Sequence, residues 1–294
     1  MSTLPSSADY FALASRNGKS NRDSFSNFFE CWLVEQNQYL QELISASKDH
    51  ESAEPNASLS FASGDVDERI LQPLINRIKQ HYERYYEAKS WWAKHDVLAM
   101  FSPSWRSSLE DAFIWIGGWR PSTAFHLLYS NSGLRMESWL DEFFRGLRMD
   151  DLGSLSATQL EQVDELQRRI IRQERELTEK MAKHQQTVAD ASMVELSHLV
   201  TESMRNDEST QESSRLEERV ESTLESKEEG LQQILHKADD LRLRTLKSVL
   251  GILSPIQAVQ FLIAAAELHL RLHDWGKARD ARHHHEPERT NSPH

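Results

Sequence analysis

The sequence has one cysteine, few glycines and no long apolar run, and each shortage excludes a class of protein. A lone Cys31 rules out a disulfide framework and fits a reducing compartment. The N-terminus has neither a basic start nor an apolar stretch, so no secretory signal is predicted. The longest uncharged run, residues 248–266, is broken at Ser254-Pro255 and contains two glutamines. It therefore predicts two helices meeting at a turn, and we expect an intracellular protein without a membrane span.

Catalytic and phosphate-binding motifs are also missing from the sequence. It contains no Gly-rich phosphate loop and no HExxH, CxxC or GxSxG pattern, so we predict a protein that is not an enzyme. The net charge is -12, from 34 Lys and Arg against 46 Asp and Glu, and the basic residues do not cluster. Because binding to phosphates needs clustered basic side chains, no direct contact with DNA is expected.

Helical periodicity dominates what is present, and no stretch alternates with period two for long. A first amphipathic helix starts near Ser24, a second runs from Asp65 past Pro73, and a short one is expected at residues 137–147. Pro73 should kink the second helix or define its first turn. The predicted fold class is all-α, a bundle of long amphipathic helices.

Residues 105–130, WRSSLEDAFIWIGGWRPSTAFHLLYS, form the densest aromatic block. Ser107 and Glu110 have the spacing of a capping box, which predicts a helix that runs up to Gly117-Gly118. Pro121 then suits the first turn of the next helix. The block predicts a helix-Gly-Gly-helix corner. Its tryptophans are interpreted as core packing in preference to a small-molecule pocket.

Two further capping boxes mark the second half of the chain. Ser156 with Gln159 opens a helix whose heptad positions are too polar for a self-sufficient zipper, which favours packing in a bundle. Ser254 with Gln257 opens the last helix, predicted from Ile256 to about Arg279.

Polar composition sets the expected domain boundaries. We predict disordered tails at residues 1–20 and 281–294 around one helical domain at 21–280. Inside that domain, residues 46–64 are read as a polar loop. Residues 202–229, with ten acidic and four basic side chains, are read as a solvated acidic connection, with an acidic interaction segment as the alternative.

One pair of side chains suggests a ligand site. His269 and His273 stand four residues apart on the last predicted helix and therefore project from one face. Such a pair can bind a metal or haem iron, although ordinary partly buried or surface histidines explain the spacing as well. Cys31 has no histidine that would activate it, and we expect it to be inert.

The segment His81 to Leu128, HYERYYEAKSWWAKHDVLAMFSPSWRSSLEDAFIWIGGWRPSTAFHLL, resembles the plant domain shared by Delay of Germination proteins and the C-terminal half of TGA transcription factors. Two more blocks, at residues 155–183 and 229–277, agree in order and spacing. The resemblance covers about residues 20–280. TGA factors carry a bZIP region before this domain, and this chain leaves no room for one, so the likeness is greater to the stand-alone Delay of Germination-like proteins.

The resemblance implies a helical regulatory protein of seed dormancy and abscisic acid signalling, present in nucleus and cytoplasm. Its expected partners are type 2C protein phosphatases, contacted through Phe29 and Trp32 of the first helix, or bZIP and TGA-type factors in a transcriptional co-regulator role. The family is also associated with haem bound by histidines of the last helix, where His269 and His273 fall. Whether the domain forms a homo-oligomer stays open.

Overall fold

The computed structural model describes residues 6–17, 22–53, 63–131, 155–206 and 210–284. Within these ranges every regular element is a helix, and an isolated β-bridge joins Trp115 to Gly118. The prediction of an all-α fold is confirmed. The short helix expected at residues 137–147 lies outside the described residues.

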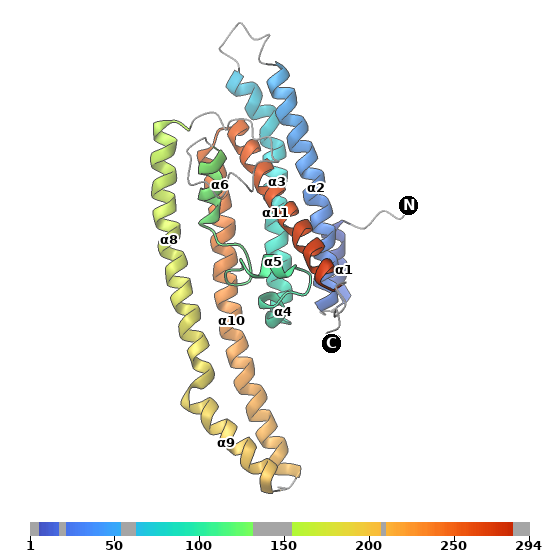
Figure 1. Cartoon of the computed structure of the whole chain (residues 1–294), viewed down its shortest axis with the longest axis vertical. Helices are drawn as coiled ribbons and strands as arrows, with labels where there is room; N and C mark the ends of the chain where they lie inside the picture. The colour runs from blue at the N-terminus through green and yellow to red at the C-terminus, as the bar shows by residue number, and fades with distance from the viewer. Residues whose placement is uncertain (1–5, 18–21, 54–62, 132–154, 207–209, 285–294) are drawn as a thin grey trace, which may run out of the picture.

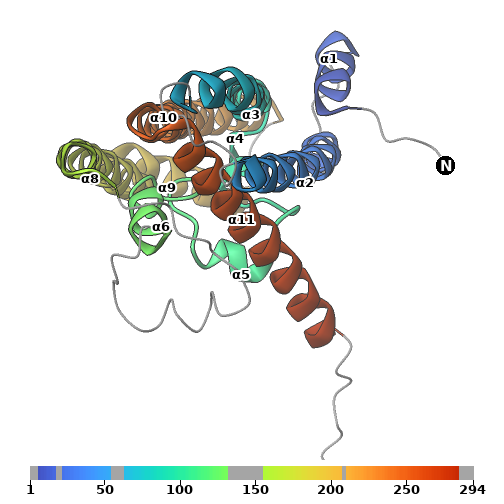
Figure 2. The ribbon, with the colours of Figure 1, turned by 90° about the horizontal axis from the view of Figure 1, so that it is seen from above.

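The helices form a bundle with one long projection (Figure 1). In chain order they are α1 (Ser7–Asn17), α2 (Arg22–Ala53), α3 (Ser63–Ala93), α4 (Val97–Phe101), α5 (Ser108–Asp111), α6 (Thr123–Asn131), α8 (Ala157–Gln186), the 3-10 turn η2 (Thr187–Ala189), α9 (Ala191–Asn206), α10 (Thr210–Ile252) and α11 (Pro255–His284). The pairs α2/α3 and α8/α10 are antiparallel, and α11 crosses the bundle between them (Figures 1 and 2). Among the described residues, no helix is long and apolar enough to cross a membrane.

Two clusters of buried side chains hold this body together. The larger cluster joins α2, α3, α6, α8, α10 and α11 through aliphatic residues and the buried rings of Phe125 and Phe261. The smaller cluster is rich in aromatic residues and joins α1, α2, α3, α4 and α10. Its largest rings, Phe25, Phe28, Phe29, Trp32 and Trp92, are each at most 2 % exposed. The core therefore draws on apolar positions at helical spacing, although Ile70 (65 % exposed), Phe113 (71 %) and Val188 (69 %) lie outside it.

Beyond the body, α9 and the first half of α10 pack against each other and project as an arm, defined as residues 191–206 and 210–229 (Figure 1). The arm begins after the 3-10 turn η2, where Lys227 of α10 donates hydrogen bonds to the Thr187 carbonyl (2.9 Å) and to Asp190 (2.7 Å). A Cβ atom on Gly230 would lie 2.2 Å from Cε1 of His184, so glycine lets α8 and α10 approach closely there.

Several segments predicted as unstructured are helical. The predicted tail 1–20 contains α1, the predicted loop 46–64 contains the end of α2 at residues 46–53, and the acidic segment 202–229 lies in α9 and α10 apart from residues 207–209, which are not described. At the C-terminus, α11 continues to His284. Composition misled because Ala in α1, and Glu, Gln, Lys and Arg in the acidic segment, are good helix formers. In addition, α1 packs against α2, and α9 packs against α10.

All three predicted capping boxes are present. Ser107 and Ser156 each accept from the backbone N–H three residues on, whose side chain bonds back to the serine N–H, and Gln257 bonds back to the Ser254 N–H at 3.0 Å. However, the helix after Ser107 ends at Asp111 instead of reaching Gly117. Pro73 lies inside α3, which begins at Ser63, so the proline does not mark the first turn.

Candidate functional site

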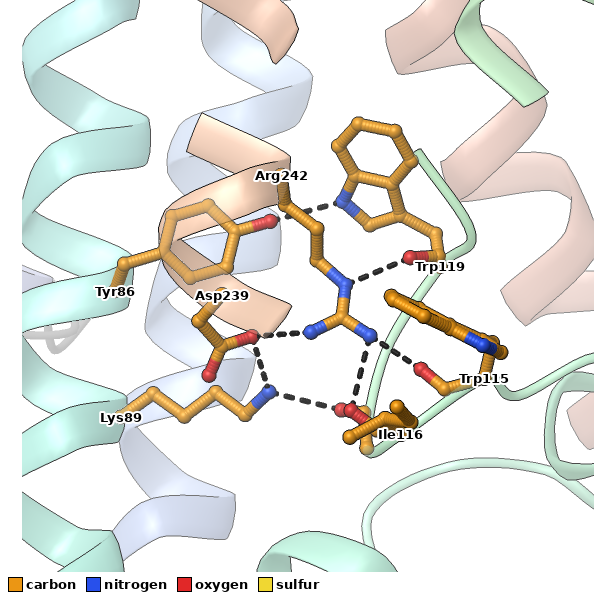
Figure 3. A network of polar contacts seen from close by, with 8 residues as sticks. Tyr86, Lys89, Trp115, Ile116, Trp119, Asp239 and Arg242 are labelled. Carbon is orange, nitrogen blue, oxygen red and sulfur yellow. Dashed lines mark hydrogen bonds and ion pairs between the residues drawn. The ribbon is translucent and has the colours of Figure 1, made fainter. Parts of the chain in front are cut away.

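Hydrogen bonds from Arg242 of α10, whose side chain is fully buried, hold the turn at residues 115–119, which we call the glycine turn. The Arg242 guanidinium donates hydrogen bonds to the carbonyl oxygens of Trp119 (2.6 Å), Ile116 (2.9 Å) and Trp115 (Figure 3). Five fixed donors suit arginine to this task, since one side chain satisfies several buried carbonyls at once.

Two charged groups complete the network around Arg242. Asp239 accepts from Arg242 at 2.5 Å and from Lys89 of α3 at 2.9 Å, and Lys89 also donates to the Gly117 carbonyl at 2.9 Å (Figure 3). Burial, opposed by the charge of Asp239, lowers the pKa of Lys89 to about 7. The network therefore joins α3, α10 and the turn through groups that are buried and paired.

The turn needs its two glycines for steric reasons. Gly117 has φ of +68°, and a Cβ atom there would lie 2.7 Å from Leu235 Cδ1. A Cβ atom on Gly118 would lie 2.8 Å from Cζ of Arg242. Residues 115 and 116 adopt a tight turn in place of the predicted helix, with Ile116 at φ of +44°, and Arg242 donates to both of their carbonyls.

His273, one of the two predicted ligand histidines, joins α11 to α5. Its Nδ1 lies 3.0 Å from Glu110 Oε2, and Glu110 also accepts hydrogen bonds from the hydroxyl (2.6 Å) and the backbone N–H (2.8 Å) of Ser107. Burial would raise the pKa of Glu110, but the hydrogen bonds from His273 and Ser107 outweigh it and lower the pKa to about 2. The ionised carboxylate is thus the centre of this contact.

His269, one turn earlier on α11, is partly buried among aromatic rings. Its ring centroid lies 5.5 Å from that of Trp32 and 6.4 Å from that of Phe29. Burial is the main cause that lowers the pKa of His269 to about 4, and nearby Arg106 acts in the same direction. His269 is therefore neutral at physiological pH, the form in which imidazole ligates a metal.

The two histidines meet the requirements of a haem site in part. The carboxylate of Glu110 fixes His273 through Nδ1, which is the arrangement that orients metal-bound histidines and leaves Nε2 for the ligand. His269 faces rings instead of a carboxylate. Across the described ranges, no group of three His, Cys, Asp or Glu side chains could hold a metal ion. Haem binding by His269 and His273 therefore stays a prediction.

The structure buries Phe29 and Trp32, the residues predicted to contact a partner, and the contact itself stays a prediction. Each side chain is only 1 % exposed, and both pack in the aromatic cluster against α3 and α11. They therefore offer no surface to a partner in this conformation. The exposed face of α2 carries other residues: Glu30, Val34 (45 % exposed) and Asn37.

Sequence reasoning missed Lys89, Asp239 and Arg242. A signal was available for Arg242, because it falls in the same helical stripe as the buried Ala238, Thr245 and Val249. A charged residue in an otherwise apolar stripe indicates a buried partner. For Lys89 and Asp239 the partners lie 150 residues apart in the chain, and nothing local reveals the pairing.

Comparison with known proteins gives one consistent family. The family model DOG1, described as seed dormancy control, matches residues 40–130. The chain is 30 % identical to Protein DOG1-like 4 of Arabidopsis thaliana over 87 % of this chain and 94 % of that protein. It is 25 % identical to Protein RESPONSE TO ABA AND SALT 1 of Arabidopsis thaliana, over 87 % of this chain and 96 % of that protein. Transcription factor TGA3 of Arabidopsis thaliana is 27 % identical over 87 % of this chain, which spans 54 % of that factor.

Proposed function

Because the chain belongs to the DOG1 family of seed dormancy control, we propose that it is a non-enzymatic regulatory protein that acts by binding other proteins. The observation that carries the proposal is the match to a DOG1-like protein over 94 % of that protein's length. The match spans the body and the arm together, so the whole helical assembly is the unit that is similar.

The geometry of the buried polar groups supports a binding role. Arg242 and Lys89 hold the glycine turn, and Glu174 of α8 accepts from the N–H of Ser122 at the start of α6 (2.5 Å) and from Arg120 (2.9 Å). Each of these groups fixes backbone at a turn or a helix start. They hold the turn and the start of α6 in place, and the proposed binding uses the outer faces of this framework.

The biological context that we propose is seed dormancy and abscisic acid signalling, with type 2C protein phosphatases as partners. The names of the DOG1 family and of RESPONSE TO ABA AND SALT 1 support this context. The proposed location is the nucleus and the cytoplasm. Since Phe29 and Trp32 are buried, the contact is assigned to the exposed face of α2, at Glu30, Val34 and Asn37.

Affinity capture with the intact chain tests the phosphatase proposal. Val34→Glu should reduce recovery of type 2C phosphatases at least tenfold, because it places a charge in the middle of the proposed contact. Val194→Glu on α9 is the matched control, since Val194 is 48 % exposed and lies in the arm. Equal recovery by both variants would remove the face of α2 from the proposal, and no recovery by the wild-type chain would reject these partners.

A second candidate is a transcriptional co-regulator that reaches DNA through bZIP partners. The match to transcription factor TGA3 favours it. Co-precipitation with bZIP factors from nuclear extract is the expected result. Exclusion of the protein from nuclei would reject this role.

Haem binding is the third candidate, and the fixed orientation of His273 by Glu110 favours it. Haemin should give a Soret shift that is lost in the His269→Ala/His273→Ala variant and retained in His126→Ala, whose side chain is exposed on α6. A shift that persists in the double variant would reject this site. When bound, haem would supply a redox-active iron, and His273 would hold it through Nε2.

A further inference from the structure

Helix α1 is short and mostly exposed. It has 11 residues and lies at the periphery, on the side of α2 away from α8 and α10 (Figure 2). Among residues 7–16 of this helix, only the side chains of Ser7 (1 % exposed) and Ala14 (9 %) are buried, and Leu13 is 60 % exposed. An isolated helix of fewer than about 12 residues is marginal in water, so the surface beneath α1 keeps it helical.

That surface offers a fixed acceptor for the start of a helix. Glu35 of α2 accepts hydrogen bonds from the Ser7 backbone N–H (2.6 Å) and from the Ser7 hydroxyl (2.7 Å). Its other neighbour is His81 of α3, a fully buried side chain whose Nδ1 lies 3.3 Å from Glu35 Oε2. Burial would raise the pKa of Glu35, but its contacts with His81 and Ser7 lower it. The carboxylate therefore meets the unpaired donors that every helix N-terminus presents.

Next to Glu35, aromatic side chains of α2 and α3 surround Phe11 of α1. The ring of Phe11 lies edge-on to Trp91 (6.0 Å between centroids, 76°) and to Phe28 (6.4 Å, 65°), and 5.5 Å from Trp92. Such edge contacts add to the apolar area that the ring buries. We call the surface formed by Phe28, Glu35, Trp91 and Trp92 the α1 groove.

The three residues of α1 that pack against the body lie on one face of the helix. Ser7, Phe11 and Ala14 stand at positions i, i+4 and i+7, which is the spacing by which amphipathic helices dock in grooves. We propose that the α1 groove is a docking site for a partner helix that presents Ser or Thr, an aromatic residue and a small residue at these positions. In the free chain α1 occupies the groove and must leave when the partner helix binds.

This inference rests on the proposed function in one respect, that the chain acts by binding proteins. It names a surface other than the exposed face of α2, and its test uses a peptide of known sequence. If the peptide binds as expected but no phosphatase is recovered, the α1 groove is supported and the phosphatases are rejected as partners. If phosphatases are recovered but the peptide does not bind as expected, the phosphatases are supported and the groove is rejected.

The experiment measures binding of a fluorescent peptide of residues 6–17, SSADYFALASRN, to the full-length chain by anisotropy. The variant Phe11→Ala/Ala14→Glu weakens the competing α1 of the chain itself. It should bind the peptide at least tenfold tighter than the wild-type chain. Against this variant, a peptide with Phe11→Ala should bind at least tenfold more weakly than the native peptide, and a Leu13→Ala peptide should bind as tightly as the native one.

Circular dichroism checks that the variant keeps its helices. Ser7→Ala provides a milder version, because it removes only the hydroxyl hydrogen bond and should tighten peptide binding by about threefold. Equal affinity of the wild-type chain and both variants for the peptide would overturn the proposal. Equal affinity of the Phe11→Ala and Leu13→Ala peptides would overturn it as well.

Discussion

The two halves of α10 are one continuous helix in different surroundings. In the body, Leu235, Leu241 and Val249 are at most 1 % exposed, and Arg242 is fully buried. In the arm, between residues 213 and 229, every described side chain is partly or fully exposed, and Leu224 is 42 % exposed. The body half touches α3, α6 and α8, while the arm half packs beside α9.

The difference shows that helix formation and burial are separate properties of this sequence. Both halves have residues with good helix propensity, so both are helical. Only the half that meets several other helices builds a core, and the acidic residues gather in the half that does not. The body therefore carries the stability, whereas the arm presents surface.

The largest expected effect is in the body. Asp239→Ala leaves the cations of Lys89 and Arg242 buried without their carboxylate, which should lower the free energy of unfolding by about 3–5 kcal/mol. Glu221→Ala, at an exposed position in the arm half of the same helix, should change it by less than about 0.5 kcal/mol. Urea unfolding measures both. Similar losses of unfolding free energy in the two variants would contradict the claim that the body half of α10 carries the stability and the arm half does not.

Glycine substitutions should give an intermediate effect. Gly118→Ala forces a methyl group against Arg242 and should cost about 1–3 kcal/mol. Gly251→Ala in α10 is the matched control, because nothing lies within 4 Å of a Cβ atom there. It should be neutral or stabilise the protein by up to about 1 kcal/mol, since alanine favours a helix. Thermal melts should show a lower melting temperature for Gly118→Ala and no decrease for Gly251→Ala, and a decrease in both would contradict the steric account.

Acid should weaken the body through His269. Its pKa is about 4 in the folded chain and near 6.5 when unfolded, so the unfolded state binds more protons between these values. The stability is complete above about pH 6.5 and falls as the pH drops toward 4. In His269→Gln, the loss over this range should be smaller by roughly 2 kcal/mol, less than the full pKa difference gives because the ring is partly exposed. Urea midpoints at pH 7 and 4.5 measure it, and an unchanged loss would count against the burial of this ring.

The smallest effect is expected in the arm. Met204, 82 % exposed on α9, contributes little buried area, so Met204→Ser should alter the free energy of unfolding by less than about 0.5 kcal/mol. Denaturant titration checks this. A loss above about 1 kcal/mol would mean that the arm is part of the cooperative core.

Local signals were sufficient for much of the fold. The capping boxes at Ser107, Ser156 and Ser254 depend on residues three positions apart, and all three were predictable. Features that depend on distant partners were not. Helix α1 is held by Glu35, 28 residues away, and the glycine turn is held by Arg242, more than 120 residues away.

In the candidate site, too, the local feature was predictable from the sequence and the distant partner was not. The sequence placed His269 and His273 on one helix, and the structure adds Glu110, 163 residues from His273, as the group that fixes the ring. The family resemblance points to Phe29 and Trp32 as a partner contact, but their burial depends on α3 and α11. Periodicity identifies the face of a helix and leaves open what covers it.

Hydrogen exchange along α10 tests the division between body and arm most directly. Amides of residues 234–250 should exchange at least about 100-fold more slowly than those of residues 213–226, because opening the body disrupts its core and opening the arm does not. Equal protection along the whole helix would contradict the account.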